Sequence, residues 1–475
     1  MNLSSTIYNY LSSIYDENFA QKYSDFIDKE TSQYIRVNLL KTSLLQLKEK
    51  LKNDYNVETE EVPGFNNALK VVSGGKEIGK LVEHIIGEYY MQGLSSMVPP
   101  VVLAPNEDDI VLDLCSAPGS KTTSIGELMN NKGTLVANEI ALDRLKMLVA
   151  NVERMNLVNT GIIHSKGEIL SKLFNEHFDK ILVDAPCSGL GILQKKDEVN
   201  NWWNTDKAVG LGELQIKLLI SGIKMLKPGG ELVYSTCTLS VEENELVINK
   251  ILKKYPVELV DVELPVKSTN AFTEYKGEKL NESISKCRRI IPWEADSDGF
   301  FIAKFLKTDN TEPLEPITLQ RPEYRLYHYS HKDIRLKLKN IPTLFGIDDE
   351  ILDNYLYILK GNDIFFVNKN WQEEKTAPFE RIGTKFGIYD KNSETTFHTQ
   401  AAQVLQKYIT KNIYEIQDQA ELKTYLEGGI IKKDLPTGQC LVKYKDFILG
   451  TAIIVKGGIK SRFPRAKRTQ GISYY

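Results

Sequence analysis

The chain has 475 residues, 42% hydrophobic and 26% charged, which is enough for several domains and a sizeable core. Its 60 basic and 63 acidic residues give a net charge of −3, which excludes a uniformly basic coat but allows a local basic surface. The sequence shows no signal-peptide pattern, no membrane-length apolar run, and five cysteines too widely spaced for a disulfide framework or a zinc site. We therefore expect a cytoplasmic protein with reduced thiols, no metal site and no membrane partner.

Residues 1–100 show short helical periods of mixed character. Beyond them, apolar runs that predict strands alternate with helical patterns. The expected strands lie in 109–120, 133–140, 160–165, 178–186, 227–238 and 298–307, and the expected helices at 121–130, 141–157, 168–175, 211–226 and 241–254. This alternation predicts βαβ units, a parallel sheet and an α/β fold, in which ligands bind beyond the carboxyl ends of the strands. A polar stretch at 308–316 indicates a linker, and 438–458 holds further strand candidates.

The first βα turn, "DLCSAPGSKT" (113–122), contains a single glycine, Gly119. A dinucleotide site would show G-x-G-x-x-G, and a P-loop G-x-x-x-x-G-K-[ST]. One glycine suits a nucleoside without a pyrophosphate, and S-adenosylmethionine is the common one. Glu139, 20 residues after Gly119, is placed to accept hydrogen bonds from two ribose hydroxyls. The plainer alternative is an ordinary βα turn followed by a surface acid.

Two expected strands end in cysteine turns, "DAPCSG" (184–189) with Cys187 and "STCT" (235–238) with Cys237. A single free cysteine is usually a small buried hydrophobe, which is what we expect of the thiols of Cys115, Cys287 and Cys440. Two thiols at the ligand edge of one sheet favour covalent catalysis instead. A thiolate that adds to carbon 6 of a pyrimidine makes carbon 5 nucleophilic enough to accept a methyl group. Asp184 would supply the carboxyl group that polarises the ring.

Taken together, these segments resemble the Nop/Sun family of RNA cytosine carbon-5 methyltransferases. "RVNLLKTS" (36–43), "YMQGLSSMVPP" (90–100), "LDLCSAPGSKT" (112–122), "VEENELVI" (241–248) and "DGFFIAKF" (298–305) are similar to other motifs of that family, so the resemblance covers about residues 30–307. It implies a Rossmann-like S-adenosylmethionine-dependent methyltransferase domain.

The resemblance also implies a role for each matched residue. Cys237 would be the nucleophile, Cys187 would assist release of the product, and Asp184 would hydrogen-bond the cytosine edge. The residues implied for the cofactor are Cys115, Ser116, Ala117, Pro118, Gly119, Lys121, Glu139, Arg144 and Asp184. Where the family has an acid near the adenine, this sequence has Lys166, with Glu168 two residues later, which weakens the expectation for cofactor affinity.

The last third resembles, more weakly, the C-terminal extension of bacterial members that act on small-subunit (16S) ribosomal RNA. No all-helical RNA-binding domain is seen ahead of the catalytic unit, as another bacterial branch has. Between residues 456 and 468 lie six basic residues and no acid, with Phe463 among them as a possible stacking surface. The expected RNA contacts are Lys460, Arg462, Arg465, Lys467 and Arg468. A solvated basic tail is the plainer alternative.

We thus expect four regions: an N-terminal RNA-binding α+β extension (1–100), the Rossmann-like catalytic domain (101–307), a linker with a small mixed domain (308–390), and a C-terminal RNA-binding region of PUA-like, mixed or β character (391–475). The expected activity is methylation of carbon 5 of a cytosine in 16S ribosomal RNA by a monomer. Transfer RNA as substrate and a catalytically silent assembly factor stay open. A DNA cytosine methyltransferase would use Cys187 as nucleophile, and an amino-group methyltransferase would have an aromatic there, so both fit less well.

Overall fold

The computed structural model describes residues 3–317, 319, 321–390 and 394–468. Its centre is a ten-stranded sheet in the order β11-β14-β15-β9-β8-β5-β6-β7-β19, with β10 paired to β15. The strands are β5 (Ile110–Asp113), β6 (Thr134–Asn138), β7 (Thr160–Ile163), β8 (Phe178–Asp184), β9 (Leu226–Thr236), β10 (Val257–Val260), β11 (Thr269–Asn270), β14 (Arg288–Ile290), β15 (Phe300–Lys307) and β19 (Phe379–Ile382). β9, β8, β5, β6 and β7 run parallel, which confirms the predicted α/β class.

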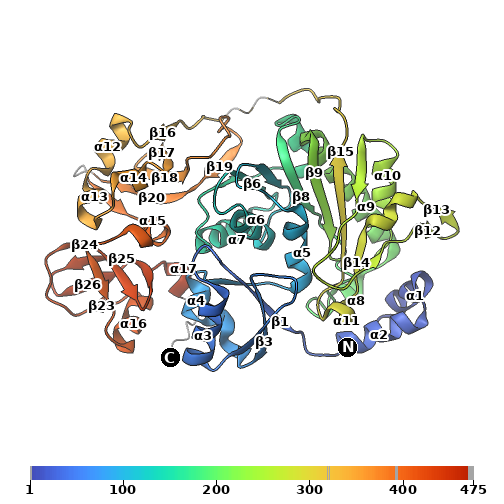
Figure 1. Ribbon diagram of the computed structural model, residues 1–475, viewed down its shortest axis with the longest axis horizontal. Helices are drawn as coiled ribbons and strands as arrows, with labels where there is room; N and C mark the ends of the chain where they lie inside the picture. The colour runs from blue at the N-terminus through green and yellow to red at the C-terminus, as the bar shows by residue number, and fades with distance from the viewer. Residues whose placement is uncertain (1–2, 318, 320, 391–393, 469–475) are drawn as a thin grey trace.

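Helices cover both faces of this sheet (Figure 1). They are α5 (Leu94–Leu103), α6 (Ser120–Leu128), α7 (Leu142–Arg154), α8 (Val199–Trp202), α9 (Thr205–Met225), α10 (Glu245–Leu252) and α11 (Pro292–Ala295), with 3-10 turns η2 (Gly167–Lys172) and η3 (Glu282–Lys286) and a small hairpin of β12 (Glu274–Tyr275) and β13 (Glu278–Lys279). The chain builds β5, β6 and β7 toward one side and then β8 and β9 toward the other. A ligand cavity is therefore expected where the order reverses, at the carboxyl ends of these strands.

Two expected helices differ from those observed, for local reasons. The helix expected at 168–175 is only the 3-10 turn η2, whose Gly167 carbonyl accepts a hydrogen bond from Ser221 of α9. The helix expected from residue 241 begins at Glu245. Asn244 sits outside helical geometry because its side chain accepts from Thr236 and donates to the Thr238 carbonyl, holding the turn that carries Cys237.

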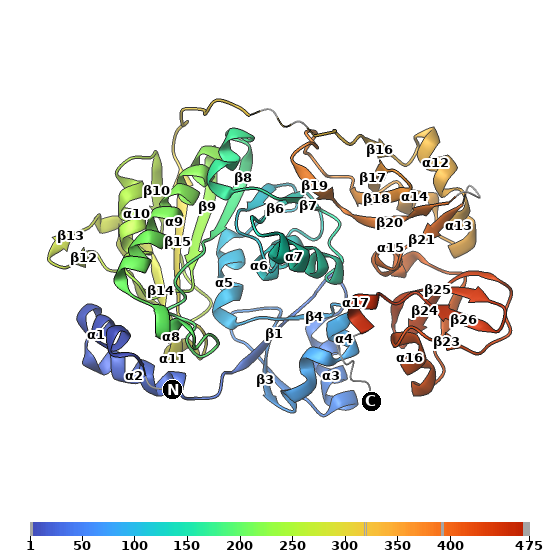
Figure 2. The same ribbon diagram turned by 180° about the vertical axis from the view of Figure 1, so that it is seen from behind.

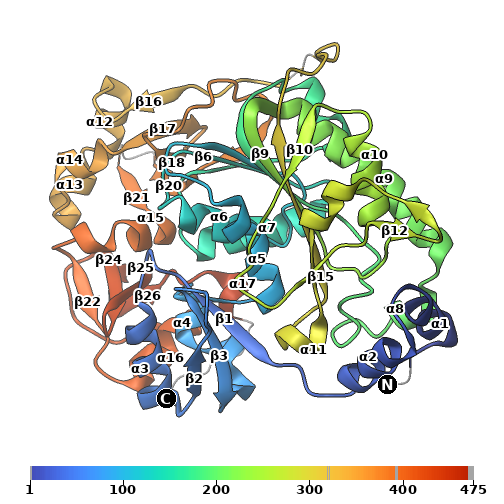
Figure 3. The same ribbon diagram turned by 45° about the vertical axis from the view of Figure 1, so that its right-hand side comes forward.

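The N-terminal region has two parts. Helices α1 (Ser5–Ile14) and α2 (Glu17–Ile27) form a hairpin beside α8 and α11 (Figure 3). A four-stranded sheet in the order β2-β3-β1-β4 follows, made of β1 (Gln33–Val37), β2 (Glu58–Glu61), β3 (Ala68–Ser73) and β4 (Tyr89–Met91), with α3 (Leu44–Tyr55), η1 (Gly75–Lys80) and α4 (Val82–Ile85). Arg36 of β1 is buried and bonds Glu127 of α6, which fastens this sheet to the catalytic domain.

The C-terminal third contains two five-stranded sheets. The first holds β16 (Leu326–His328), β17 (Tyr355–Lys360), β18 (Asp363–Asn368), β20 (Thr384–Tyr389) and β21 (Thr395–Phe397), with α12 (Lys332–Leu338), α13 (Asn340–Phe345) and α14 (Asp349–Leu352). The second holds β22 (Ile413–Glu415), β23 (Ile430–Ile431), β24 (Gly438–Tyr444), β25 (Phe447–Val455) and β26 (Gly458–Ser461), with α15 (Thr399–Val404), η4 (Gln406–Tyr408), α16 (Gln419–Leu426) and α17 (Arg465–Arg468).

The two C-terminal sheets are joined closely to the rest of the molecule. β19, which lies between β18 and β20 in the sequence, adds to the edge of the catalytic sheet, antiparallel to β7 (Figure 2). The expected boundary at residue 390 falls between β20 and β21, which pair in one sheet. The division of the chain into four regions stays a prediction. Within the described ranges no helix is long and apolar enough to cross a membrane.

Candidate active site

The two predicted cysteines meet at the carboxyl edge of the sheet. β8 and β9 are parallel neighbours with Asp184 opposite Ser235, so the turns that follow them leave the sheet side by side. The sulfur atoms of Cys187 and Cys237 lie 3.0 Å apart, and both thiols are free. The Cys187 sulfur also accepts a hydrogen bond from the backbone N–H of Cys237 at 3.3 Å. The sequence thus placed the pair correctly at one edge, and the structure brings the two thiols into direct contact.

A buried carboxylate, Glu243, holds both cysteine turns. Its Oε1 accepts from the backbone N–H of Ser188 at 2.8 Å, and its Oε2 accepts from the hydroxyls of Ser188 and Thr238. Ser188 follows Cys187 and Thr238 follows Cys237, so one side chain fixes both turns. Gln215 of α9 donates to Oε1 at 3.1 Å. Burial raises the pKa of Glu243. Sequence reasoning placed "VEENELVI" only as the helix after the second cysteine and missed this role.

The two thiols differ in their environment. The hydrogen bond to Cys237, together with burial, raises the pKa of Cys187 well above its usual value. Cys187 therefore keeps its proton near neutral pH and can donate it toward the neighbouring sulfur. Because the thiolate is the nucleophilic form of cysteine, this environment disfavours Cys187 as the attacking group. Burial likewise raises the pKa of Cys115, in line with the expectation that its thiol matters less.

Asp184 ends β8 beside the thiols and is held by two neighbours. Its Oδ2 accepts from the Lys121 ammonium at 2.6 Å and its Oδ1 from the Ser235 hydroxyl at 2.7 Å. Lys121, expected to serve the cofactor, is buried and also bonds the Ser96 hydroxyl at 3.1 Å. An ionised carboxylate has about four lone-pair sites, so Asp184 can still accept a hydrogen bond from a ligand.

A cavity of about 1010 Å³ opens at this edge. Of the residues expected to hold the cofactor, Cys115, Ala117, Pro118, Glu139, Arg144 and Asp184 line it, as do Cys187 and Cys237. The other three, Ser116, Gly119 and Lys121, lie behind this lining. Ser116 donates to the Asp113 carbonyl, and Gly119 takes a left-handed φ of 107° as it begins α6. Ser116 and Gly119 therefore shape the turn and do not face the cavity.

The lining fits S-adenosylmethionine. The carbon side chains of Ala117, Pro118, Ile140 and Met147 offer an apolar wall for an adenine ring. Buried Asn138 also lines the cavity, and its Oδ1 has no hydrogen-bond partner within the described part of the chain, which leaves an acceptor for a ribose or amino donor. Glu139 is held by the Ala141 N–H at 2.8 Å.

Several lining residues were not anticipated because they come from the long irregular segment between β8 and α9. Ile192, Lys196 and Trp202 are among them. The hairpin α1–α2 supports this segment, since the Tyr23 hydroxyl donates to the Leu190 carbonyl. No local motif marks these positions, because their place depends on a contact with residues more than 150 positions away in the sequence. Lys166 and Glu168 both line the cavity too, at the wall where an acid was expected.

The expected RNA contacts are distributed over β26 and the segment after it. Lys460, Arg462 and Arg465 are exposed, and Arg468 donates to the Phe463 carbonyl. The side chain of Lys467 lies outside the described residues. The expectation that Phe463 offers a stacking surface is wrong: it is 1% exposed and packs in the core near Tyr425, because an aromatic side chain after the last strand closes that sheet.

Known proteins resemble this chain over nearly its whole length. Residues 100–306 match the family model for 16S rRNA methyltransferase RsmB/F. The ribosomal RNA small subunit methyltransferase F of Shewanella piezotolerans is 32% identical, covering 93% of this chain and 92% of that protein. The tRNA (cytosine(49)-C(5))-methyltransferase of Pyrococcus abyssi is 35% identical over 61% of this chain and 92% of its own length.

Solved structures resemble about two thirds of this chain. A methyltransferase homolog protein from Pyrococcus horikoshii is 33% identical, with a TM-score of 0.55, and covers 64% of this chain and all (100%) of its own. NSun6 from the same organism, solved with SFG, is 25% identical with a TM-score of 0.55, covering 64% of this chain and 98% of its own. With paired thiols beside a fitting nucleoside cavity, these likenesses show that the chain belongs to the 16S rRNA methyltransferase RsmB/F family and is an S-adenosylmethionine-dependent RNA (cytosine-C5)-methyltransferase.

Proposed function

We propose that the enzyme methylates carbon 5 of a cytosine in small-subunit (16S) ribosomal RNA through a covalent bond between Cys237 and carbon 6. The observation that carries this proposal is the contact of two free thiols, 3.0 Å apart, at the wall of the cofactor cavity. Two purely structural cysteines would have no reason to meet there, since buried thiols pack as hydrophobes. The acidic partner Asp184 lies at the same wall.

Cys237 attacks. Its sulfur forms a bond to carbon 6, and the electron pair of the carbon 5–carbon 6 double bond makes carbon 5 nucleophilic. S-adenosylmethionine, when bound, supplies an electrophilic methyl group whose bonding pair stays with its sulfur. Carbon 5 then carries both a methyl group and a proton. When a water molecule takes that proton, the carbon–hydrogen electron pair rebuilds the double bond, and the bond from carbon 6 to Cys237 breaks with its pair on sulfur.

Cys187 serves the last step. Its raised pKa keeps it protonated near neutral pH, and its sulfur lies 3.0 Å from Cys237. It can therefore hydrogen-bond the departing sulfur and lower the barrier to release. Asp184, oriented by Lys121 and Ser235, would accept from the exocyclic amine of the cytosine and fix the ring over the thiols. A paired cytosine would have to be flipped out to reach this wall.

The relatives support small-subunit ribosomal RNA as the substrate. The match to a small-subunit enzyme extends over 93% of this chain, whereas the transfer RNA enzyme matches 61%. The C-terminal sheets would contribute RNA binding through exposed Lys460, Arg462 and Arg465, with Lys467 and Arg468 beside them. We further propose that the enzyme acts as a cytoplasmic monomer. Transfer RNA is the second candidate substrate, and a silent assembly factor is the alternative from another class.

The test compares Cys187→Ala with Cys237→Ala for protein–RNA adducts on a denaturing gel. Each variant is incubated with S-adenosylmethionine and either small ribosomal subunits or transfer RNA. Cys187→Ala should accumulate an adduct, because release is impaired, and Cys237→Ala should give neither adduct nor methylation. An adduct on Cys237→Ala alone would reverse the two roles. Wild-type protein that binds subunits without methylating either RNA would favour the silent factor.

A further inference from the structure

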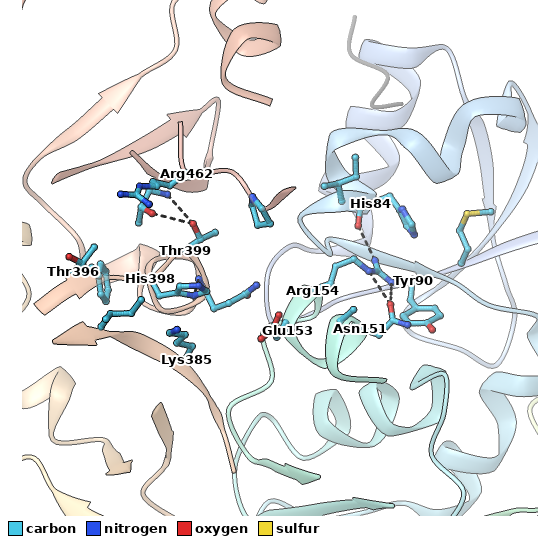
Figure 4. A pocket seen from close by; sticks show the side chains of 18 residues that line it. His84, Tyr90, Asn151, Glu153, Arg154, Lys385, Thr396, His398, Thr399 and Arg462 are labelled. Atoms are coloured by element: carbon cyan, nitrogen blue, oxygen red, sulfur yellow. Dashed lines mark hydrogen bonds between the residues drawn. The ribbon is translucent and has the colours of Figure 1, made fainter. Parts of the chain in front are cut away.

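A second large cavity, of about 940 Å³, lies between the C-terminal sheets and the N-terminal half of the molecule. We call it the C-terminal cleft. One wall comes from α4, β4 and the end of α7, and the other from β20, β21, the start of α15, and the segment after β26 (Figure 4). It is lined by His84, Ile85, Tyr90, Met91, Ala150, Asn151, Glu153, Arg154, Lys385, Ile388, Thr396, Phe397, His398, Thr399, Gln400, Thr451, Arg462 and Pro464.

The charge of this cleft is positive. Its one carboxylate, Glu153, is paired with Arg381 at 2.6 Å, and Lys385 is paired with Asp363. The remaining cations are Arg154 and Arg462, and no ion pair among the described residues includes either of them. Arg154 is half-buried, and burial lowers its pKa to about 10, so it is charged near neutral pH. Arg154 donates hydrogen bonds to the Asn151 Oδ1 and to the His84 and Tyr89 carbonyls, all of them neutral acceptors. These bonds hold its guanidinium in place and leave its positive charge to attract an anion together with exposed Arg462.

The other groups in the cleft suit a nucleotide. Exposed Met91 and Ile388 give an apolar lining for bases, with buried Phe397 packed behind them. Gln400 is 3% exposed, and its Oε1 has no hydrogen-bond partner among the described residues. A buried amide oxygen left unsatisfied is uncommon and would be completed by a donor from a ligand, such as a base amine or a 2′-hydroxyl.

The cleft is also connected to the catalytic centre. The Arg154 and Arg36 guanidinium groups both lie over the ring of Tyr90, at 4.8 and 5.2 Å from its centroid. Arg36 in turn donates to the Ser120 carbonyl at 2.7 Å, next to Lys121, which bonds Asp184. An anion at Arg154 would thus bind at one end of a continuous chain of contacts that reaches the active-site carboxylate.

We propose that the C-terminal cleft binds a single-stranded segment of the same RNA whose cytosine enters the active site, with phosphates at Arg154 and Arg462 and a base edge or ribose at Gln400. This inference rests on the proposed function, because it takes RNA as the substrate. Phosphate contacts position an RNA and make its binding depend on the salt concentration. Contacts to base edges and 2′-hydroxyls add affinity that does not depend on salt in this way.

The test measures binding of the full-length enzyme to deproteinised 16S ribosomal RNA over a range of salt concentrations. Arg462→Ala should weaken binding about tenfold and reduce the slope of log affinity against log salt by about one. Arg462→Lys should keep the wild-type slope, because the charge is kept. Gln400→Leu should weaken binding about fivefold with the slope unchanged. The matched control is Lys411→Ala, an exposed lysine of the same region outside the cleft, which should behave as wild type.

Two further readouts separate this inference from the proposed function. In steady-state methylation, Arg462→Ala should raise KM for RNA about tenfold and leave kcat unchanged, since it is remote from the thiols. Ultraviolet crosslinking followed by mass spectrometry should recover RNA on the peptides that contain the exposed lining residues Met91 or Ile388. If wild type methylates RNA while Arg462→Ala matches Lys411→Ala and no crosslink falls in the cleft, the cleft inference is wrong and the function stands. A ribosomal protein crosslinked there in place of RNA would also overturn it. If wild type methylates no RNA, the proposed function itself fails.

Discussion

The catalytic edge, where β5, β6, β8 and β9 end, and the C-terminal cleft are both concave and charged, but they are built differently. At the catalytic edge the carboxylates have fixed partners: Asp184 with Lys121, and Glu243 with both cysteine turns. In the cleft, Arg154 is hydrogen-bonded only to neutral acceptors, and the Gln400 oxygen has no donor partner among the described residues. This difference indicates that the catalytic edge holds its groups rigidly for the reaction, whereas the C-terminal cleft offers groups that a polymer ligand can bind.

The largest expected effect tests the rigid side of this comparison. Asp184→Asn should lower the rate of methyl transfer about 10³-fold, on the order of 4 kcal/mol, because the preorganised acceptor for the cytosine is lost and Lys121 loses its charge partner. Single-turnover methylation measures the rate, and calorimetric titration of S-adenosylmethionine shows whether cofactor binding is affected as well. Asp179→Asn, at the opposite end of the same strand and bonded to Lys227, is the matched control. Equal losses in the two variants would show that Asp184 acts only through the stability of β8.

The sequence could predict the catalytic edge better than the C-terminal cleft. The catalytic edge is made of short motifs at the ends of strands, and parallel pairing brings "DAPCSG" and "STCT" together without further information. Glu243 could not be assigned, because a carboxylate in "VEEN" resembles the solvated start of a helix until its four donor groups are seen. The cleft joins residues from 84 to 464, and no local pattern specifies how those segments pack.

Phe463 shows the limit most clearly. A lone aromatic among cations fits a base-stacking surface as well as it fits a core residue, and only the fold of β24, β25 and β26 decides that it is buried. β19 is a similar case, since four residues after a long polar segment carry too little pattern to predict that they extend the catalytic sheet. Arg462 was expected to contact RNA, which stays a prediction, and the cavity that it lines was not expected from the sequence.

The second expected effect concerns pH. Asp113 ends β5, is fully buried, and burial raises its pKa to about 7. An acid with a raised folded-state pKa binds protons more tightly when folded, so its contribution to stability falls as pH rises from about 4 to about 7 and is then constant. Asp113→Asn should remove this loss. The difference in free energy of unfolding between variant and wild type should therefore shift in favour of the variant by about 3 kcal/mol between pH 4.5 and pH 8. Urea unfolding at the two pH values measures it, and an equal difference between variant and wild type at both would contradict it.

A smaller effect is expected from the carboxylate that ties the cysteine turns. Glu243→Ala should cost about 2–3 kcal/mol of stability, because it leaves the buried Ser188 N–H and hydroxyl without an acceptor. It should also let the two turns separate, which would slow release of methylated RNA. Glu243→Gln keeps the size and an acceptor and should retain most of both properties. Urea unfolding and the amount of trapped adduct are the two measurements. An alanine variant with wild-type release would limit Glu243 to a structural role.

The smallest effect tests the join between the two regions. Gly161 of β7 faces β19, and a Cβ atom there would lie 2.5 Å from Phe379 and 2.6 Å from Trp371, both of which are buried. Gly161→Ala should therefore push the added strand away and cost about 1–2 kcal/mol. Gly210→Ala is the control with the opposite sign: a Cβ on this glycine of α9 meets nothing, so alanine should stabilise the helix by up to about 1 kcal/mol. Thermal unfolding gives both values, and hydrogen exchange at β19 locates the change.

The same variant tests how the cleft is held. Because the cleft needs the C-terminal sheets held against α7, Gly161→Ala should also weaken RNA binding while the rate of methyl transfer at saturating RNA stays the same. Faster exchange at β19 with RNA affinity unchanged would mean that the cleft walls are held by the packing of α4 against the last sheet instead.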